Sequence, residues 1–187
     1  MRHSPGLADA LRCGTHQSHK DVEQAKSLKG IFADSFSLGD YSELISRWQV
    51  LFENLEPVLT GLEIASYRYR VRLPALDADL AALEQMGYRN AAAKGEPFWK
   101  PLNYESAVGA CYVIEGSCLG AKLICKRLDE KLGQKISHAK RFYSLDFKRW
   151  PWFRQQLDRV GQDPSVDPQK VVSGARDCFL AIESYMG

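Results

Sequence analysis

The sequence predicts an all-α protein that folds as one domain over residues 1–187. Hydrophobic residues recur at three- and four-residue steps along most of the chain, which is the spacing of a helix face and not of a strand. The chain shows no internal repeat and no convincing β-hairpin, and its 187 residues are enough for one domain with a sizeable core.

The helices follow from this spacing and from the residues that begin and end them. Ser4 and Pro5 make a good N-cap and first turn. Pro57 is expected to mark a kink or short break, Pro74 suits a first helical turn, and Gly87 ends a helix. Helices are therefore expected over residues 4–28, 40–55, 58–64, 73–86, 104–132, 153–160 and 167–185, with irregular chain at 89–101 and 142–152.

Composition excludes several classes of protein. Hydrophobic residues make up 45% of the chain and charged residues 26%, which is ordinary globular usage. The formal net charge of +2 gives no reason to expect a nucleic-acid partner. We find no apolar run near the roughly 18 residues of a membrane span, and no signal-peptide core in residues 1–10. A cytoplasmic protein without a membrane partner is expected.

The five cysteines predict no disulfide framework, because their number is odd and none are closely paired. Cys111, Cys118 and Cys125 recur every seven residues, so they drift only about 20° per step along one helix face. We interpret them as small buried hydrophobic residues. The competing hypothesis is a different helical enzyme with Cys118 or Cys125 as nucleophile, which would need a lowered thiol pKa and a nearby base.

Two glycines interrupt the long helix expected at 104–132. Gly116 and Gly120 each cost about 1 kcal/mol relative to alanine, and they lie about 40° apart on the helix surface. The resulting strip of bare backbone lets a flat, bulky group come close, or lets the helix bend. It equally suits tight packing of two helices in a scaffold or interaction protein. The glycines alone leave both explanations open.

One histidine stands out among His3, His16, His19 and His138. His16 and His19 are about 60° apart on the first helix, but a two-histidine metal site would need further ligands nearby. Glu23 lies four residues after His19, where a carboxylate could fix the imidazole tautomer and leave the other nitrogen for a metal. Arg12 lies about 10 Å before His19 on nearly the same face, which suits a cation that meets carboxylates of a ligand held by His19.

Two stretches together resemble the signatures of bacterial haem oxygenases. Residues 11–19 read Leu-Arg-x-x-Thr-x-x-x-His, like the proximal helix of that family, and residues 112–120 read Tyr-x-x-Glu-Gly-Ser-x-Leu-Gly, like its distal helix. Length, helical organisation and the order of the stretches match as well. The resemblance implies a single-domain helical bundle that holds haem between the proximal and the distal helix.

The resemblance also implies roles for individual residues. His19 corresponds to the axial iron ligand and Glu23 to its hydrogen-bonding partner. Gly116 and Gly120 correspond to the distal glycines whose backbone closes over the haem. The other implied positions are Arg12 and Tyr112 at the haem propionates, Arg72 as a distal arginine that organises pocket water, Ser117 in the distal motif, and Phe179 on the C-terminal helix.

By the same resemblance, the activity would be cleavage of the haem macrocycle at a meso carbon to give biliverdin, carbon monoxide and ferrous iron. Haem would be both cofactor and substrate, with O2 as co-substrate. The chain has no flavin or nicotinamide fingerprint, so electrons would come from a ferredoxin or an NAD(P)H-dependent reductase. The product would serve iron acquisition or supply a phytochrome. The alternative is a haem sensor or carrier on the same fold that lacks turnover.

Overall fold

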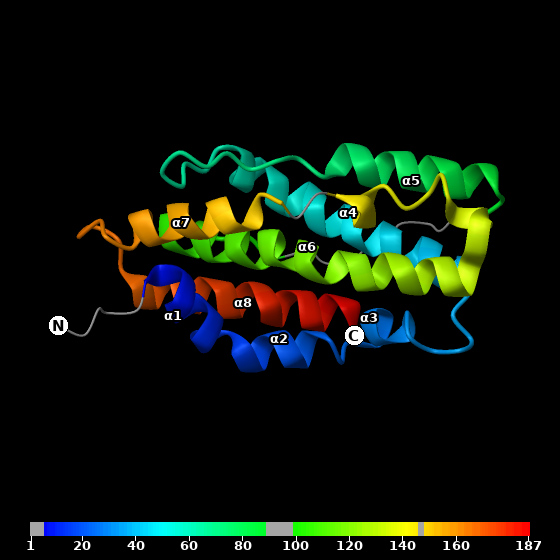
Figure 1. Ribbon diagram of the computed structural model, residues 1–187, viewed down its shortest axis with the longest axis horizontal. Helices are drawn as coiled ribbons and strands as arrows, with labels where there is room; N and C mark the ends of the chain where they lie inside the picture. Colours follow the sequence, from blue (N-terminus) through cyan, green and yellow to red (C-terminus); the bar gives the residue numbers. More distant parts are fainter. Residues whose placement is uncertain (1–5, 89–98, 146–147) are drawn as a thin grey trace.

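The computed structural model describes residues 6–88, 99–145 and 148–187, and the regular secondary structure in these ranges is helical. Figure 1 shows the helices as an elongated bundle. The elements are α1 Leu7–Gly14, α2 His16–Val22, α3 Lys26–Gly30, α4 Leu38–Thr60, α5 Leu73–Gln85, α6 Tyr104–Leu132, the 3₁₀ turns η1 Gly133–Ile136 and η2 Phe142–Ser144, α7 Trp150–Val160 and α8 Pro168–Met186.

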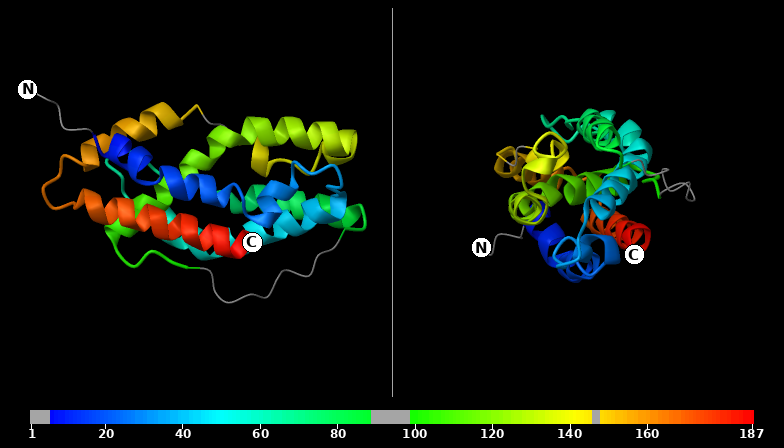
Figure 2. Two further views of the ribbon diagram at one scale, coloured as in Figure 1. Left: turned by 90° about the horizontal axis from the view of Figure 1, so that it is seen from below. Right: turned by 90° about the vertical axis from the view of Figure 1, so that its right-hand side faces the viewer.

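Helix α6 runs along the middle of the bundle in the view of Figure 1, and the left view of Figure 2 shows its second half along one edge. Its main packing partner is α8, and the two short helices α1 and α2 also lie against α8. Helix α4 pairs with α5, and α7 packs on α1. The helices α1, α2 and α6, which carry the two motifs, therefore all pack on α8.

Helices α6 and α8 come close through two glycines. A Cβ on Gly109 would lie 2.5 Å from the backbone nitrogen of Ala175, and a Cβ on Gly174 would lie 2.9 Å from Cβ of Ser106. Neither position can hold a side chain unless the backbones move apart. Close packing of two helices, one of the explanations considered for Gly116 and Gly120, is therefore the role of Gly109 in the same helix.

The prediction of one continuous helix over 4–28 is wrong, because this part of the chain forms the three short helices α1, α2 and α3. Helix α1 ends at Gly14, and Thr15 leaves helical geometry with φ −109° and ψ 4°. The carbonyl of Gly14 accepts a hydrogen bond from Nε of Arg176 at 2.7 Å. A Cβ on Gly14 would also meet Cγ1 of Val172 at 2.5 Å. Docking on α8 therefore breaks the helix at this glycine.

Other helix ends agree with the sequence to within a few residues. Helix α4 begins after a capping box of Ser37 and Asp40 and continues through Pro57 to Thr60, so the helix expected over 58–64 ends early. Gly87 has φ +84° just after α5, as expected of a glycine that ends a helix. Helix α6 has the predicted bounds. Most of the predicted loop at 89–101 lies outside the described residues.

One helical stretch, Tyr104–Ile136, is long and apolar enough to cross a membrane by length and composition, contrary to the sequence expectation. Core helices of soluble proteins pass the same test, so the finding is weak evidence for a membrane span. Here α6 packs extensively on α8 and carries eleven buried residues. Of the apolar window, 44% is buried within the molecule, so packing in the core accounts for part of its hydrophobicity.

Candidate active site

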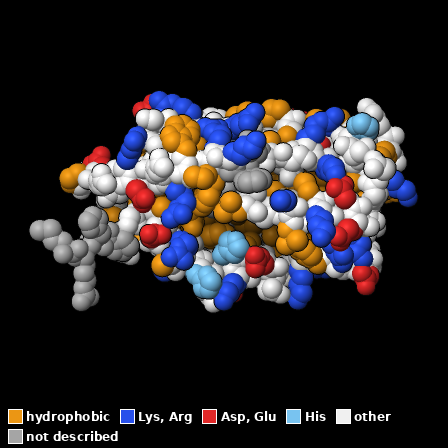
Figure 3. Space-filling view, viewed as in Figure 1, with side chains coloured by type: hydrophobic (Ala, Val, Ile, Leu, Met, Phe, Trp, Pro, Cys, Tyr) orange, Lys and Arg blue, Asp and Glu red, His pale blue; other side chains and the backbone are white. Residues whose placement is uncertain are grey.

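A hollow lined by hydrophobic side chains opens between α6 and α2, with histidine side chains of α2 at its edge (Figure 3). On the α6 side, Leu119 and Leu123 are 52% and 60% exposed. A Cβ built on Gly120 would meet nothing within 4 Å. This part of α6 therefore presents apolar side chains and bare backbone to open space, and none of the described residues packs on Gly120 within that distance.

His19 stands on the α2 side of this hollow. Its Nδ1 lies 3.5 Å from Oε1 of Glu23, the residue at the C-terminal end of α2. Its ring meets the edge of the buried Phe179 ring from α8, with centroids 5.8 Å apart. The Nε2 atom has no hydrogen-bond or ion-pair partner in the described part of the chain. One ring nitrogen thus lies beside a carboxylate, and the other is available to a ligand.

Gly116 lies one turn before Gly120 and faces α7. A Cβ there would lie 3.4 Å from the ring of Trp150, which is already ordinary van der Waals contact. The same indole packs against Tyr112 with ring centroids 5.7 Å apart. The wall of α6 therefore changes along its length, from the aromatic contact at Tyr112 and Gly116 to open backbone at Gly120.

Positive side chains gather at the Tyr112 end of the hollow. Arg12 and Arg154 both approach Oδ1 of Asp9, at 3.7 Å and 3.2 Å. Burial raises the pKa of Tyr112, while the hydroxyl of Thr15 and the charges of Arg154 and Arg12 lower it. The tyrosine hydroxyl and two guanidinium groups thus make an end of the site that suits carboxylates.

Arg72 lies on the other side of α6. Its NH2 is 3.4 Å from Oε2 of Glu115, and its NH1 donates to Oγ of Ser117 at 3.3 Å. Glu115 and Gly120 are five residues apart and so about 140° apart around the helix. Arg72 therefore does not line the hollow directly, and it reaches the glycine wall through the exposed Ser117.

A buried carboxylate fixes the backbone of Arg72. Glu56 accepts hydrogen bonds from the Tyr69 hydroxyl at 2.9 Å and from the backbone N–H groups of Arg72 and Leu73. Burial raises the pKa of Tyr69. The charge of Arg72 lowers this pKa and the charge of Glu56 raises it further, so the phenol keeps its proton and donates the hydrogen bond. Arg72 is held at both ends, by Glu56 at its backbone and by Glu115 at its guanidinium group.

The structure thus brings His19, Glu23 and Phe179 together, and places Gly116, Gly120 and Tyr112 along one wall. Several residues of the site were missed by sequence reasoning: Asp9, Glu56, Tyr69, Glu115, Trp150 and Arg154. Glu115 lies inside the distal motif, so its position was a usable signal. Asp9 lies three residues before Arg12 on the same helix, which was also a usable signal. The remaining residues are joined to the site by contacts between distant parts of the chain, which no local spacing reveals.

The cysteines do not form a site. No disulfide links the five cysteines, and Cys13 alone is fully exposed. Burial raises the pKa values of the Cys111, Cys125 and Cys178 thiols. A nucleophile needs the opposite shift, which argues against Cys125 in that role. Within the described ranges no group of three or more His, Cys, Asp or Glu residues could hold a metal ion.

Comparison with known proteins gives the family. The chain matches the family model described as "Heme oxygenase" over residues 5–186. The chain belongs to the haem oxygenase family. A protein named "Heme oxygenase" from Xanthomonas campestris pv. campestris (strain 8004) is 31% identical over 147 residues, which cover 74% of this chain and 84% of that protein.

Solved haem oxygenases share the fold. The Leptospira interrogans enzyme superposes with a TM-score of 0.73 at 18% identity, covering 97% of this chain and 98% of that one. The Neisseria meningitidis enzyme, solved with NO and CO, gives 0.72 at 21% identity, covering 98% and 91%. Heme oxygenase-2 of Synechocystis sp. PCC 6803, solved with heme and NO, gives 0.74 at 20% identity, covering 97% and 84%. The predicted all-α fold and the prediction of an oxidoreductase of this family are confirmed.

Proposed function

We propose that this haem oxygenase family member binds haem in the hollow between α2 and α6 and cleaves it at a meso carbon. Dioxygen supplies the oxygen atoms and an external donor the electrons, and the products are biliverdin, carbon monoxide and ferrous iron. The observation that carries the proposal is the pairing of an available His19 nitrogen with a wall of bare backbone at Gly120 across one apolar hollow.

The residues fit haem in three independent respects. Its iron needs a nitrogen ligand, and Nε2 of His19 has no partner among the described residues. Its flat macrocycle needs an apolar wall that lets the ring come close, which suits the bare backbone at Gly120 with the exposed Leu119 and Leu123 beside it. Its two carboxylates need cations at one edge, for which Arg12 and Arg154 lie at the Tyr112 end.

When bound, haem supplies the iron centre at which dioxygen is activated and also the carbon that is oxidised. The chain supplies position. His19 would hold the haem iron through Nε2, and Glu23 beside Nδ1 would favour the tautomer in which Nε2 is free. Gly116 and Gly120 keep acidic side chains away from the opposite face. Arg72 and Ser117 hold polar hydrogens at the edge of the glycine wall, where water can be oriented.

The sequence shows no flavin or nicotinamide fingerprint, so the proposed reaction needs an external electron donor. A ferredoxin or an NAD(P)H-dependent reductase is the proposed electron donor, and the protein is proposed to act in the cytoplasm. Phytochrome assembly and iron acquisition would use the same product chemistry, and the isomer of biliverdin depends on how the charged end seats the ring.

The test is a hemin titration followed by addition of a ferredoxin system under air with catalase present. The expected result is a Soret band that then decays as the broad red absorption of biliverdin appears, and chromatography names the isomer. A Soret band that persists with active reductant would replace the oxygenase proposal with the haem carrier or sensor. A titration that yields no Soret band would remove haem binding altogether.

A further inference from the structure

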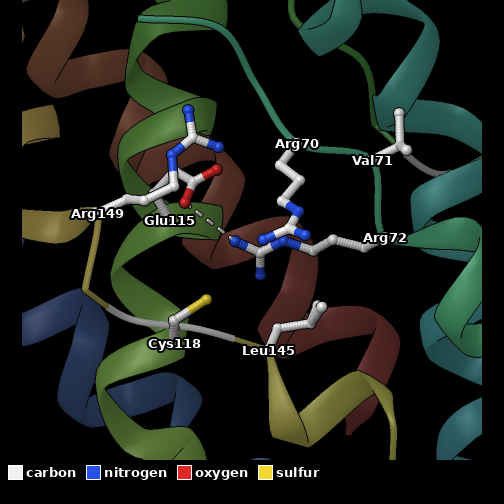
Figure 4. Close-up of a pocket in the computed structure, with 7 residues that line it drawn as sticks. All are labelled: Arg70, Val71, Arg72, Glu115, Cys118, Leu145 and Arg149. Atoms are coloured by element: carbon white, nitrogen blue, oxygen red, sulfur yellow. Dashed lines mark ion pairs between the residues drawn. The ribbon is translucent and has the colours of Figure 1, made fainter.

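The guanidinium group of Arg72 is held by long contacts. Figure 4 shows this side chain extending from the segment before α5 to Glu115 on α6. Its nitrogens lie 3.4 Å from Oε2 of Glu115 and 3.3 Å from Oγ of Ser117, beyond the roughly 2.7–3.2 Å of a usual N–H···O bond. Arg70 and Arg149 line the same small pocket and bring like charge to it. The position of the group therefore depends strongly on where the backbone of Arg72 is fixed.

Glu56, near the end of α4, fixes that backbone. Its side chain is buried, with the whole residue only 4% exposed, and it accepts hydrogen bonds from the backbone N–H groups of Arg72 and Leu73. Helix α5 begins at this point, and its N-cap residue, Arg72, has no side-chain cap of its own. Pro74 follows and has no N–H. Glu56 therefore takes the place of a capping side chain, and its negative charge suits the start of a helix.

Two aromatic residues support the same arrangement. The Tyr69 hydroxyl is a third donor to Glu56, at 2.9 Å from Oε1. A buried carboxylate with three donors cannot move without leaving some of them unpaired. The ring of Phe52, one turn before Glu56 on α4, lies under the guanidinium group, with Cζ of Arg72 5.7 Å from the ring centroid. Helix α4 therefore contacts Arg72 twice, through Glu56 at the backbone and through Phe52 at the guanidinium group.

We propose that Glu56 is a positioning residue that acts through Arg72. By fixing the backbone at the start of α5, Glu56 sets the distance of the guanidinium group from Ser117 at the glycine wall. That contact is already long, so a small displacement of the start of α5 breaks it. The placement of Arg72 is a property of the haem-free protein. Its consequence for turnover rests on the proposed function.

The placement is tested on the haem-free protein by NMR of ¹⁵N-labelled arginine side chains. The Nε–H signal of Arg72 is assigned by its loss in Arg72→Lys. Glu56→Gln should shift or broaden this signal, whereas Glu53→Gln, at an exposed glutamate three residues earlier on α4, should leave it unchanged. Glu56→Asp keeps the charge but draws the carboxylate back by one methylene group, so it should shift the signal less, and it decides the matter if Glu56→Gln does not fold. An unchanged Arg72 signal in the folded variant would overturn the proposal.

The consequence for turnover is tested on the haem-loaded protein. Glu56→Gln should bind hemin within about twofold of the wild-type affinity, because α2 and α6 form the hollow, yet form product about tenfold more slowly. Glu56→Asp should recover part of the rate. In an Arg72→Gln background, Glu56→Gln should cause no further loss of rate, because its effect passes through Arg72. Losses that multiply, or equal losses in affinity and rate, would contradict the positioning role. A wild-type protein that does not turn over haem would refute the proposed function and leave the NMR result standing.

Discussion

Alanine at two glycines of α6 should have opposite effects on stability. At Gly120 a Cβ meets nothing within 4 Å, so the haem-free protein gains the helix propensity of alanine, about 1 kcal/mol. For a chain of this size that corresponds to a rise in Tm of about 2–4 °C. At Gly109 the Cβ would lie 2.5 Å from the nitrogen of Ala175. The backbones must separate there, and overpacking of this kind costs about 1–3 kcal/mol.

Hemin affinity should also be affected by the substitution at Gly120. The new methyl group of Gly120→Ala projects into the open space that the proposal gives to the macrocycle, so hemin affinity should fall by about tenfold or more, equivalent to roughly 1.4 kcal/mol. Thermal unfolding of the haem-free proteins and hemin titrations give both quantities. A Gly120→Ala protein that is less stable than the wild type, or more stable with unchanged hemin affinity, would refute the assignment of this face to the ligand.

Further predictions address the proximal ligand, the charged end, the thiols and acid stability. His19→Ala should lose the native Soret spectrum of the hemin complex, whereas the neighbouring His16→Ala should keep it. The opposite result would show that His16, and not His19, is the iron ligand. Arg154→Gln should weaken binding of haem severalfold but not of haem dimethyl ester, which lacks the charged carboxylates, and equal losses for both would exclude a carboxylate contact. A thiol reagent near neutral pH should modify Cys13 rapidly and reach the buried thiols only after unfolding, since burial both shields them and raises their pKa values. Hydrogen bonds from the serine that caps α4 lower the pKa of Asp40, so its contribution to stability is present above its unfolded pKa of about 3.9 and is lost as the pH falls through the folded value. Asp40→Asn should therefore be less stable than the wild type at pH 7, and the difference in unfolding free energy should vanish in strong acid.

Features fixed by local spacing were predictable from the sequence. The bounds of α6 follow from its capping residue and from the glycine after its last turn, and both act within a few residues of the helix end. The approach of Glu23 to His19 is an i, i+4 relation on one short helix, so it survives the break at Thr15. The motif that marks Gly116 and Gly120 is likewise contiguous in the chain.

Features fixed by distant contacts were not predictable. The break after Gly14 depends on a hydrogen bond from Arg176, 162 residues further along. The environment of Arg72 depends on Glu56 and Glu115, which precede and follow it on two different helices. Glu56 has no local pattern that distinguishes it from a surface glutamate, and the motif around Glu115 does not show which side chain that carboxylate meets. Only packing shows that both are turned inward.

Helix α6 illustrates the limit most clearly, because it uses glycine for two purposes. Gly109 removes a side chain so that α8 can approach, whereas Gly120 removes one where no protein atom approaches. A glycine costs the helix about the same in either place. In the first case the protein recovers that cost through its own packing. In the second it recovers nothing from the described residues, which supports the proposal that a ligand binds there. The open glycine is therefore the stronger indication of a ligand, and the contact around each glycine, not the glycine itself, distinguishes a packing site from a binding site.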